Sequence, residues 1–216
     1  MTSDRRRPRP IRFDLSPPVS PALGVWPGDN PASREVLAEL DAGDHLTLST
    51  LRTTVHLGTH ADAPSHTQAG GATIDAVDLD AYLGSCQVIP LDIERGELIE
   101  PTDLQTAITQ PRVLLATGTF PDPTRFTTDF AAPSVALVAY LAAAGVVLLG
   151  TDAPSMDLFG SKDLPSHRAL VQSRIAVLEG LVLHGVPAGD YELVALPLPL
   201  VGFDASPVRA VLRDRD

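Results

Sequence analysis

The sequence predicts an α/β fold, organised as a single domain with a mixed β-sheet core and flanking helices. The length of 216 residues is enough for one full hydrophobic core, or at most a domain with a lobe. Hydrophobic residues make up 44% and charged residues 20%, as in ordinary globular proteins. Short apolar runs alternate with helix-like stretches, a pattern typical of strands that pair in parallel. We expect a disordered tail at residues 1–10 and the domain at residues 11–216.

The first third of the chain is expected to contain little regular structure before the central motif. Residues 13–30 are rich in proline and glycine, which prevents a long helix or strand. Residues 34–40 fit a helix or a strand equally well, because their periodicity does not decide between them. Residues 46–55 are predicted to be a strand that leads into the motif.

The remaining elements are predicted from apolar runs and their breakers. The sequence predicts a short helix at 77–83 that Gly84 ends, a helix at 101–108 with Pro101 in its first turn, and a loop at 120–130. The clearest helix covers 133–144, between Pro133 and Gly145. Strands are expected at 86–93, 113–117, 146–149, 175–178, 192–196 and 208–212.

Charge and cysteine content exclude several classes of protein. The formal net charge of −11 argues against a nucleic-acid partner, which normally requires a basic face. The single cysteine, Cys86, rules out an internal disulfide and begins an apolar run, so we interpret it as a buried core residue. Apolar runs are too short for a membrane span, and the arginines near the N-terminus are not followed by a signal-peptide core. We therefore expect a cytoplasmic protein without a membrane partner.

Three of the six histidines lie within residues 56–66, together with one aspartate. Neutral imidazole and carboxylate groups are ligands that first-row divalent metals prefer. We interpret His56, His60 and Asp62 as metal ligands and expect His66 to face the same cavity. Single histidines are more often ordinary hydrogen-bonded residues, but this density around a bend is harder to explain in that way.

The spacing inside this motif requires a change of chain direction. On a straight strand His56 and His60 would lie roughly 13 Å apart, at about 3.3 Å per residue, too far to share an ion. A helical turn or a tight bend is needed. Gly58 permits unusual backbone angles, and Pro64 discourages a helix from continuing.

His167 and Glu179 form a weaker pattern. His167 follows a proline and a serine that suggest a helix start, and Glu179 follows an apolar run that reads as a strand. A helix that leads into a strand can return both side chains to one cavity. An exposed capping histidine explains the same residues, so spacing alone leaves both interpretations open.

The motif His-x-Gly-Thr-His-x-Asp-x-Pro-x-His resembles the signature of the cyclase-type metal hydrolases, whose members include the bacterial kynurenine formamidases (arylformamidases). The resemblance covers nearly the whole chain from about residue 11. It also rests on Asp14-Leu15-Ser16-Pro17, Val25-Trp26-Pro27-Gly28-Asp29, Gly150-Thr151-Asp152-Ala153-Pro154-Ser155-Met156-Asp157, and Ser161-Lys162-Asp163-Leu164-Pro165 with His167. It implies the swivelling β/α/β type of fold seen in that family.

The resemblance also implies a specific site and activity. The family holds two zinc ions, and its ligands match His56, His60, Asp62, His167 and Glu179, the two carboxylates bridging both ions. His66 matches the catalytic proton shuttle and Trp26 a wall of the substrate pocket. The implied reaction is hydrolysis of N-formyl-L-kynurenine to L-kynurenine and formate in tryptophan degradation, with water activated by the metals, in a homodimer. Manganese or cobalt would also suit these ligands.

Three further points stay open at this stage. Asp152 and Asp157 are candidates for orienting ligand imidazoles, while His45 is expected at the surface and His184 in a structural role. The first alternative is a related hydrolase that acts on isatin, a cyclic imide or a lactone. One bound metal ion instead of two would favour the isatin-type enzyme. A metal-binding protein without activity is the second. The sequence contains no Gly-x-Ser-x-Gly motif, so no serine nucleophile is visible for a covalent route.

Overall fold

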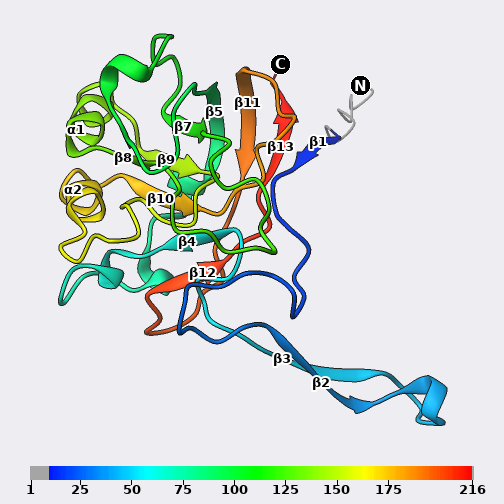
Figure 1. Ribbon diagram of the computed structural model, residues 1–216. Coiled ribbons are helices and arrows are strands. Elements are labelled where there is room, and N and C mark those ends of the chain that lie inside the picture. The colour runs from blue at the N-terminus through cyan, green and yellow to red at the C-terminus, as the bar shows by residue number, and fades with distance from the viewer. Residues whose placement is uncertain (1–9, 216) are drawn as a thin grey trace, which may run out of the picture.

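The computed structural model describes residues 10–215, so the predicted tail at residues 1–10 lies outside the described residues except for Pro10. The central element is a nine-stranded mixed sheet with two helices packed beside it (Figure 1). Its strands, in spatial order, are β1 (Ile11–Asp14), β13 (Val211–Asp214), β11 (Gly189–Val194), β5 (Leu83–Pro90), β7 (Arg112–Ala116), β9 (Leu148–Thr151), β10 (Ala176–Glu179), β4 (His60–Asp62) and β12 (Ala205–Pro207). The predicted α/β fold with a mixed sheet is confirmed.

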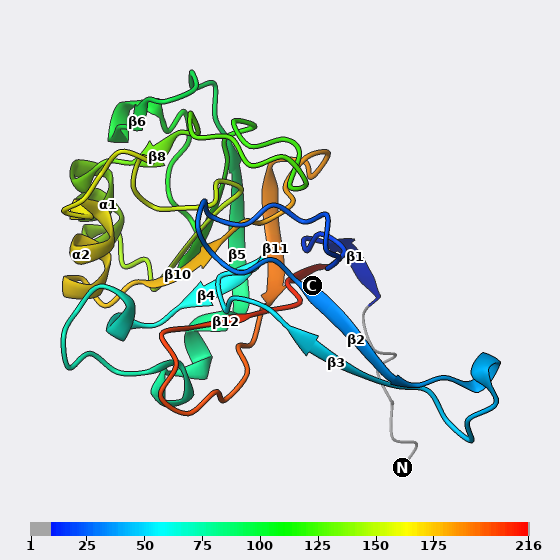
Figure 2. The same ribbon diagram turned by 60° about the horizontal axis from the view of Figure 1, so that its bottom comes forward.

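Parallel pairing is confined to the middle of this sheet. Strands β5, β7, β9 and β10 run parallel, whereas the strands on either side of them pair antiparallel. A helix at 135–143 joins β7 to β9 and a helix at 165–172 joins β9 to β10, as the predicted strand–helix–strand alternation requires, whereas β5 and β7 are joined without an α-helix. The sheet is curled, so that β4 and β12 at one edge lie near the N-terminal segment that follows β1 (Figures 1 and 2).

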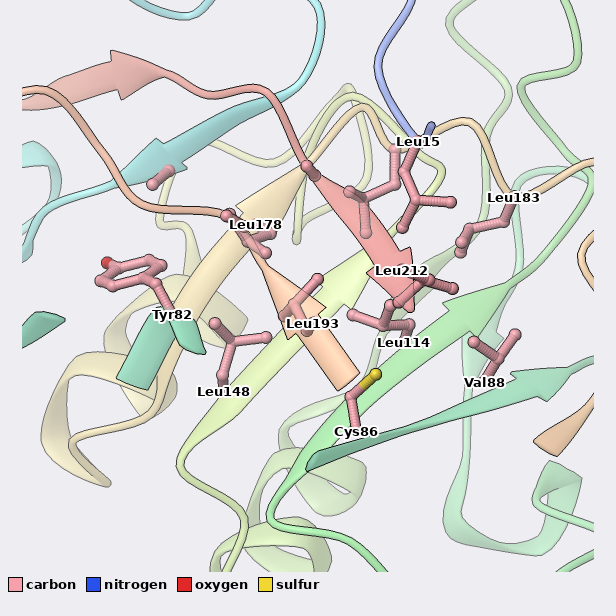
Figure 3. Close-up of a cluster of buried hydrophobic side chains, with 14 of the residues drawn as sticks. Leu15, Tyr82, Cys86, Val88, Leu114, Leu148, Leu178, Leu183, Leu193 and Leu212 are labelled. Atoms are coloured by element: carbon pink, nitrogen blue, oxygen red, sulfur yellow. The ribbon is translucent and has the colours of Figure 1, made fainter. Parts of the chain in front are cut away.

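Alternating side chains divide the core into two clusters, one on each face of the sheet. In β7, Leu114 joins one cluster, while Val113 and Leu115 join the other. Leu178 and Val177 in β10 are divided in the same way, as a period of two residues requires. Figure 3 shows the first cluster, with Leu114, Leu178, Leu193 and Leu212 enclosed between strands. The second cluster packs beneath the helices.

The two α-helices contact one another on the second face. They are α1 (Val135–Ala143) and α2 (Pro165–Gln172). The start predicted for α1 was wrong by two residues: Pro133 belongs to the short strand β8 (Ala132–Pro133), and Ser134 caps the helix by accepting a hydrogen bond from the Leu137 amide. A serine cap satisfies an amide that the first helical turn leaves free.

Two other helices predicted from sequence form only 3₁₀ turns. The stretch at 101–108 contains η5 (Pro101–Asp103), and the stretch at 77–83 contains η4 (Leu79–Tyr82). Gly84 does not end a helix; it lies inside β5, where an added Cβ would meet the Arg112 guanidinium at 3.1 Å. Short 3₁₀ turns of this kind are common connectors that helix propensity does not distinguish from α-helix.

The undecided stretch at 34–40 is a strand, β2 (Ser33–Ala38), which pairs with β3 (Leu48–Arg52). These two strands form a hairpin that projects away from the rest of the molecule, with η1 (Leu40–Ala42) at its tip (Figures 1 and 2). The predicted strand at 46–55 therefore belongs to this hairpin and ends before the metal-ligand motif.

The other elements complete the description. They are β6 (Leu98–Ile99), which pairs in parallel with β8, and the 3₁₀ turns η2 (Pro64–His66) and η3 (Ile74–Ala76). Cys86 is fully buried, as predicted. Within residues 10–215, neither helix has the length and apolar character needed to cross a bilayer.

Candidate metal centre

The motif at residues 56–66 bends sharply before it enters β4. Gly58 has a φ of +55°, a left-handed conformation that glycine adopts without strain. Just after it, the Thr59 hydroxyl lies 2.7 Å from the Gly180 carbonyl oxygen and 3.1 Å from that of Leu15. This bend brings the rings of His56 and His60 to a centroid distance of 5.0 Å, far closer than a straight strand would allow. The sequence requirement for a tight bend is therefore met.

Strand β10 places Glu179 directly beside this bend. Glu179 pairs with His60 in the antiparallel register of β10 and β4, so both side chains lie on the same face of the sheet. Glu179 Oε2 lies 3.2 Å from His60 Nε2. The next residue, Gly180, passes so close to the bend that an added Cβ would lie 2.3 Å from the Gly58 carbonyl oxygen. Glycine is therefore required where the two halves of the site meet.

Helix α2 supplies His167 from its first turn. The Asp157 carboxylate accepts hydrogen bonds from the Ser166 and His167 amides, both at 3.0 Å, and lies 2.7 Å from His167 Nδ1. Asp157 thus performs the capping role that the sequence suggested for Ser166, whose hydroxyl donates to the Pro133 carbonyl oxygen. Because Asp157 engages Nδ1, the Nε2 atom of His167 faces the site.

The two buried carboxylates each divide their oxygens between two groups of imidazoles. Asp62 Oδ1 lies 3.1 Å from His56 Nδ1 and 3.4 Å from His60 Nε2, whereas Oδ2 lies 3.5 Å from His167 Nε2. Glu179 repeats the division, with Oε2 near His60 and Oε1 at 3.1 Å from His167. The five residues predicted as ligands therefore converge, arriving from the 56–62 segment, α2 and β10.

The donor atoms at this point fit divalent metal ions. His60 Nε2 and both oxygens of Asp62 are buried without a hydrogen-bond partner among the described residues, a costly arrangement unless a further group satisfies them. His60 Nδ1 donates to the Gly58 carbonyl oxygen at 2.9 Å, so in the neutral ring Nε2 carries the free lone pair. Imidazoles held in this way, with one nitrogen bonded to an oxygen and the other free, are typical of metal ligands.

Burial and charge act against each other on these groups. Burial lowers the pKa of His60, but Asp62 and Glu179 outweigh it and raise the pKa to about 10. Burial likewise lowers the pKa of His167, yet Asp157, Asp62 and Glu179 hold it well above its usual value. For Asp62, burial raises the pKa and the neighbouring imidazoles bring it well below its usual value. In the metal-free protein, buried imidazolium and carboxylate groups thus compensate one another.

His66 lies beside the five residues, on the turn η2 that Pro64 begins. Its Nε2 is 4.0 Å from Asp62 Oδ2, its ring centroid is 4.4 Å from that of His56, and its side chain is 29% exposed. The predicted proton shuttle therefore borders both the buried carboxylate and the open cavity.

Asp204 is a member of this cluster that the sequence did not reveal. Its Oδ2 lies 3.0 Å from His56 Nε2 and 3.2 Å from His66 Nδ1. Partial burial raises the pKa of Asp204, but hydrogen bonds with the two histidines keep it below its usual value. Asp204 immediately precedes β12, which pairs with β4, and no local motif surrounds it. Its position therefore follows from the sheet, which the sequence spacing does not show.

A large cavity opens onto the cluster and has an aromatic wall. The cavity has a volume of about 810 Å³ and is lined by His56, His60, His66, His167 and Glu179, and also by Trp26. Trp26 lies with its ring centroid 4.9 Å from that of Phe159 and 5.5 Å from that of Phe126. Phe120 and Phe130 extend the aromatic cluster, which holds the single tryptophan and four of the six phenylalanines. Trp26 was predicted from the sequence as a wall of the pocket, whereas its aromatic partners were not.

The remaining candidates differ in how they relate to the site. Asp152 borders the cavity but accepts hydrogen bonds from Thr117 and Gly118, so it does not orient a ligand imidazole as suggested. Asp157 does contact a ligand imidazole. His184 is exposed and borders the cavity, and His45 is exposed near the tip of the hairpin.

Comparisons with known proteins identify the family and the fold. Residues 13–158 match the model of the Cyclase family, described as "Putative cyclase". A solved structure described as a potential metal-dependent hydrolase with cyclase activity is 30% identical, with a TM-score of 0.82 over 94% of this chain and 98% of that one. A predicted metal-dependent hydrolase from Bacillus stearothermophilus is 29% identical, with a TM-score of 0.79 over the same shares of the two chains.

An isatin hydrolase bound to the product analogue thioisatinate shares the fold at 20% identity, with a TM-score of 0.77 over 94% of this chain and 92% of that one. The family match covers most of the chain, including the whole 56–66 motif, Trp26 and Asp157. The 30% identical structure extends the likeness to nearly the full length of both chains. This chain therefore belongs to the Cyclase family.

Proposed function

We propose that this protein is a metal-dependent hydrolase that cleaves N-formyl-L-kynurenine to L-kynurenine and formate. One observation carries the proposal. Two buried carboxylates, Asp62 and Glu179, each present one oxygen to His60 and the other oxygen to His167. The Asp62 oxygen that faces His60 also faces His56. Carboxylates that divide their oxygens in this way suit two neighbouring cations. The aromatic cavity that opens onto them supports a flat substrate.

The five residues His56, His60, Asp62, His167 and Glu179 would hold two zinc ions, and manganese or cobalt would suit the same nitrogen and oxygen atoms. When bound, such ions lower the pKa of water and polarise a carbonyl oxygen. The protein's own contribution is to keep the imidazoles oriented. Gly58 and Asp157 do so by engaging the second nitrogen of His60 and of His167.

His66 would act as the proton shuttle. Hydrolysis adds water across the formyl C–N bond: oxygen bonds to the formyl carbon, and a proton must reach the departing aniline nitrogen. His66 borders the cavity and its Nε2 points toward Asp62, so it can take a proton near the ligands and deliver it to the nitrogen. Imidazole suits this role because its ordinary pKa lies close to neutrality.

The aromatic wall would hold the aryl ring. Trp26, Phe126 and Phe159 form a continuous group in edge and tilted contacts, and Trp26 and Phe126 line the cavity. Aromatic side chains bind flat apolar rings through dispersion and through offset or edge contacts. An aryl formamide placed against this wall would direct its formyl group toward the histidine cluster.

A second candidate is an uncharged cyclic aryl amide such as isatin. Neither lysine nor arginine lines the cavity among the described residues, so no permanently charged cation is present there to pair with the carboxylate of an amino-acid substrate. A neutral ring makes no such demand. The same nucleophile and the same proton shuttle would open a cyclic amide.

Both candidates can be tested with one set of assays. We expect the purified protein to contain two metal ions by elemental analysis and to release kynurenine from N-formyl-L-kynurenine, followed by absorbance. Isatin serves as the competing substrate in the same cuvette. A higher kcat/KM for isatin would favour the second candidate, and a metal-loaded protein that hydrolyses neither compound would contradict the proposal.

The His66→Ala variant tests the proton shuttle. It should retain both ions and lose about 10²- to 10⁴-fold in kcat, the usual contribution of general acid–base catalysis. His45→Ala, at an exposed site on the hairpin, is the matched control and should keep full activity. Undiminished turnover in His66→Ala would refute the assigned role.

A further inference from the structure

Asp204, like Asp157, is an acidic side chain that contacts the proposed metal ligands without being one of them. It stands at the outer edge of the site, 45% exposed, while Asp62 and Glu179 are each 4% exposed. Its backbone is held firmly, because its carbonyl oxygen accepts the Ala63 amide at 2.8 Å where β12 pairs with β4. Asp204 therefore has a defined position despite its exposure.

The two contacts of Asp204 converge on a single oxygen atom. Oδ2 lies 3.0 Å from His56 Nε2 and 3.2 Å from His66 Nδ1. A carboxylate oxygen has two lone pairs and can accept a hydrogen bond from each ring. Both rings must then carry their proton on the nitrogen that faces Asp204. In the neutral form of each ring, the opposite nitrogens, His56 Nδ1 and His66 Nε2, then carry the free lone pairs.

The free nitrogens are the two that face the chemistry. His56 Nδ1 lies 3.1 Å from Asp62 Oδ1, on the side of the proposed metal position. His66 Nε2 points toward Asp62 Oδ2 at 4.0 Å. A ring with the opposite tautomer would present an N–H group at these points, which can neither bind a cation nor accept a proton.

We propose that Asp204 is a positioning residue that sets the tautomers of His56 and His66 at once, joining a metal ligand to the proton shuttle through one carboxylate oxygen. This inference rests on the proposed function for its catalytic consequence. The tautomers themselves are a property of the folded chain. An aspartate that orients a catalytic imidazole in this way acts through the imidazole and does not touch the substrate.

Asp204→Asn is the main test, because it preserves shape but replaces the charged acceptor. Outer partners of metal-binding imidazoles typically contribute about 10- to 100-fold in metal affinity or activity. We expect kcat to fall within that range with KM changed less than about threefold, and zinc to bind more weakly but still to saturate. Asp75→Asn is the matched control, since Asp75 Oδ1 accepts the Gly202 amide in the same loop without contacting either histidine. It should leave kcat unchanged.

A double-mutant cycle separates positioning from a general loss of structure. If Asp204 acts through His66, then Asp204→Asn should cost little further activity in a His66→Ala background, apart from its effect on metal affinity, which saturating zinc removes. Full multiplication of the two losses at saturating zinc would overturn the proposal.

Nitrogen NMR of the histidine rings provides a readout that does not depend on turnover. In the zinc-loaded protein, His66 should carry its proton on Nδ1, and Asp204→Asn should shift the population toward the Nε2–H form. An Nε2–H tautomer in the unmodified protein, or an unchanged tautomer in the variant, would contradict the inference. If the unmodified protein hydrolyses neither candidate substrate, the proposed function fails, while the NMR result still decides the role of Asp204.

Discussion

Two antiparallel strand pairs in this molecule depart from the usual rule that apolar side chains are buried and charged ones exposed. One pair buries ionisable side chains, and the other exposes apolar ones. In the pair β4–β10, ionisable side chains are inside: His60, Asp62 and Glu179 are all less than 7% exposed. In the hairpin β2–β3, apolar side chains are outside: Leu48 is 51% and Leu51 63% exposed. Buried charges are costly unless they are paired or bind metal, and exposed apolar groups on an isolated hairpin are poorly stabilised in water.

Each departure therefore points to something that binds there. At β4–β10 the missing partner would be a pair of cations, because the unsatisfied atoms are nitrogen and oxygen lone pairs. At β2–β3 it would be an apolar surface. Changes in the first pair should affect metal binding and catalysis, whereas changes in the second should affect association only.

The largest effect is expected from Asp62→Asn. One oxygen of Asp62 faces His56 and the other faces His167, so the substitution should abolish binding of at least one ion. We expect kcat/KM to fall by roughly 10³-fold or more, since metal-ion catalysis is worth several kcal/mol. Elemental analysis and the formamidase assay measure both effects. Asp41→Asn, in the exposed turn at the tip of the hairpin, is the control and should change neither. Full metal content with full activity in Asp62→Asn would remove the distinction between the two regions.

The next effect concerns pH and the metal-free protein. The folded-state pKa of His60 is raised to about 10, above its value of about 6.5 in the unfolded chain. Its stabilising contribution is therefore complete below pH 6.5 and is lost as the pH rises toward 10, which amounts to a few kcal/mol in the free energy of unfolding. The zinc-loaded protein should behave in the opposite way, because metal binding requires neutral imidazole and strengthens as protons leave.

Urea unfolding between pH 6 and 10, with and without zinc, measures this difference. The two free-energy curves should diverge as the pH rises. Parallel curves would show that the imidazoles of the β4–β10 region do not exchange protons for metal.

A glycine in each region provides a smaller and more local test. Gly180 has a φ of +63° and Gly43, at the hairpin tip, a φ of +93°, so alanine is strained at both. Only at Gly180 would the new Cβ also meet backbone, at 2.3 Å from the Gly58 carbonyl oxygen, while nothing lies within 4 Å at Gly43. We expect Gly180→Ala to destabilise by about 1–3 kcal/mol more than Gly43→Ala and to weaken zinc binding. If chemical denaturation showed equal losses of unfolding free energy for the two variants, the close approach of Gly180 to Gly58 would contribute nothing to stability.

The parts of the site that were predictable from sequence are those made by neighbouring residues. His56, His60 and Asp62 are encoded within seven positions, and a bend at Gly58 is enough to assemble them. His167 and Glu179 required the family resemblance, because they lie on different elements, in the first turn of α2 and at the end of β10. Asp204 was missed since its proximity to His56 arises from the pairing of β12 with β4, which leaves no periodic signal.

The fold, like the site, was predicted only in part. Apolar runs indicated the parallel strands correctly, because burial on both faces gives a continuous hydrophobic pattern. The 3₁₀ turns at 79–82 and 101–103 were predicted as α-helices, since the local sequence carries no signal that ends the helix after one turn. The exposed hairpin was only partly recognised: its apolar residues do not alternate, since Val36 and Leu37 are adjacent and Leu48 and Leu51 are three positions apart. Among residues 10–215 nothing buries either face of it, so burial leaves no periodic pattern there.

The smallest effect on folding is expected in the hairpin, where Leu48→Ser and Leu51→Ser should change the free energy of unfolding of a single chain by no more than about 0.5 kcal/mol each. The homodimer implied by the family resemblance stays a prediction, and we propose that a second copy of the chain covers these leucines. Light scattering should then give a dimer mass for the unmodified protein and a smaller mass for the double variant, with zinc content unchanged. A monomeric unmodified protein would contradict the homodimer, and a double variant that remains dimeric would place the interface elsewhere. Either result would leave the exposed leucines without a partner. Unusual burial would then mark a binding site only at the buried charges of β4–β10.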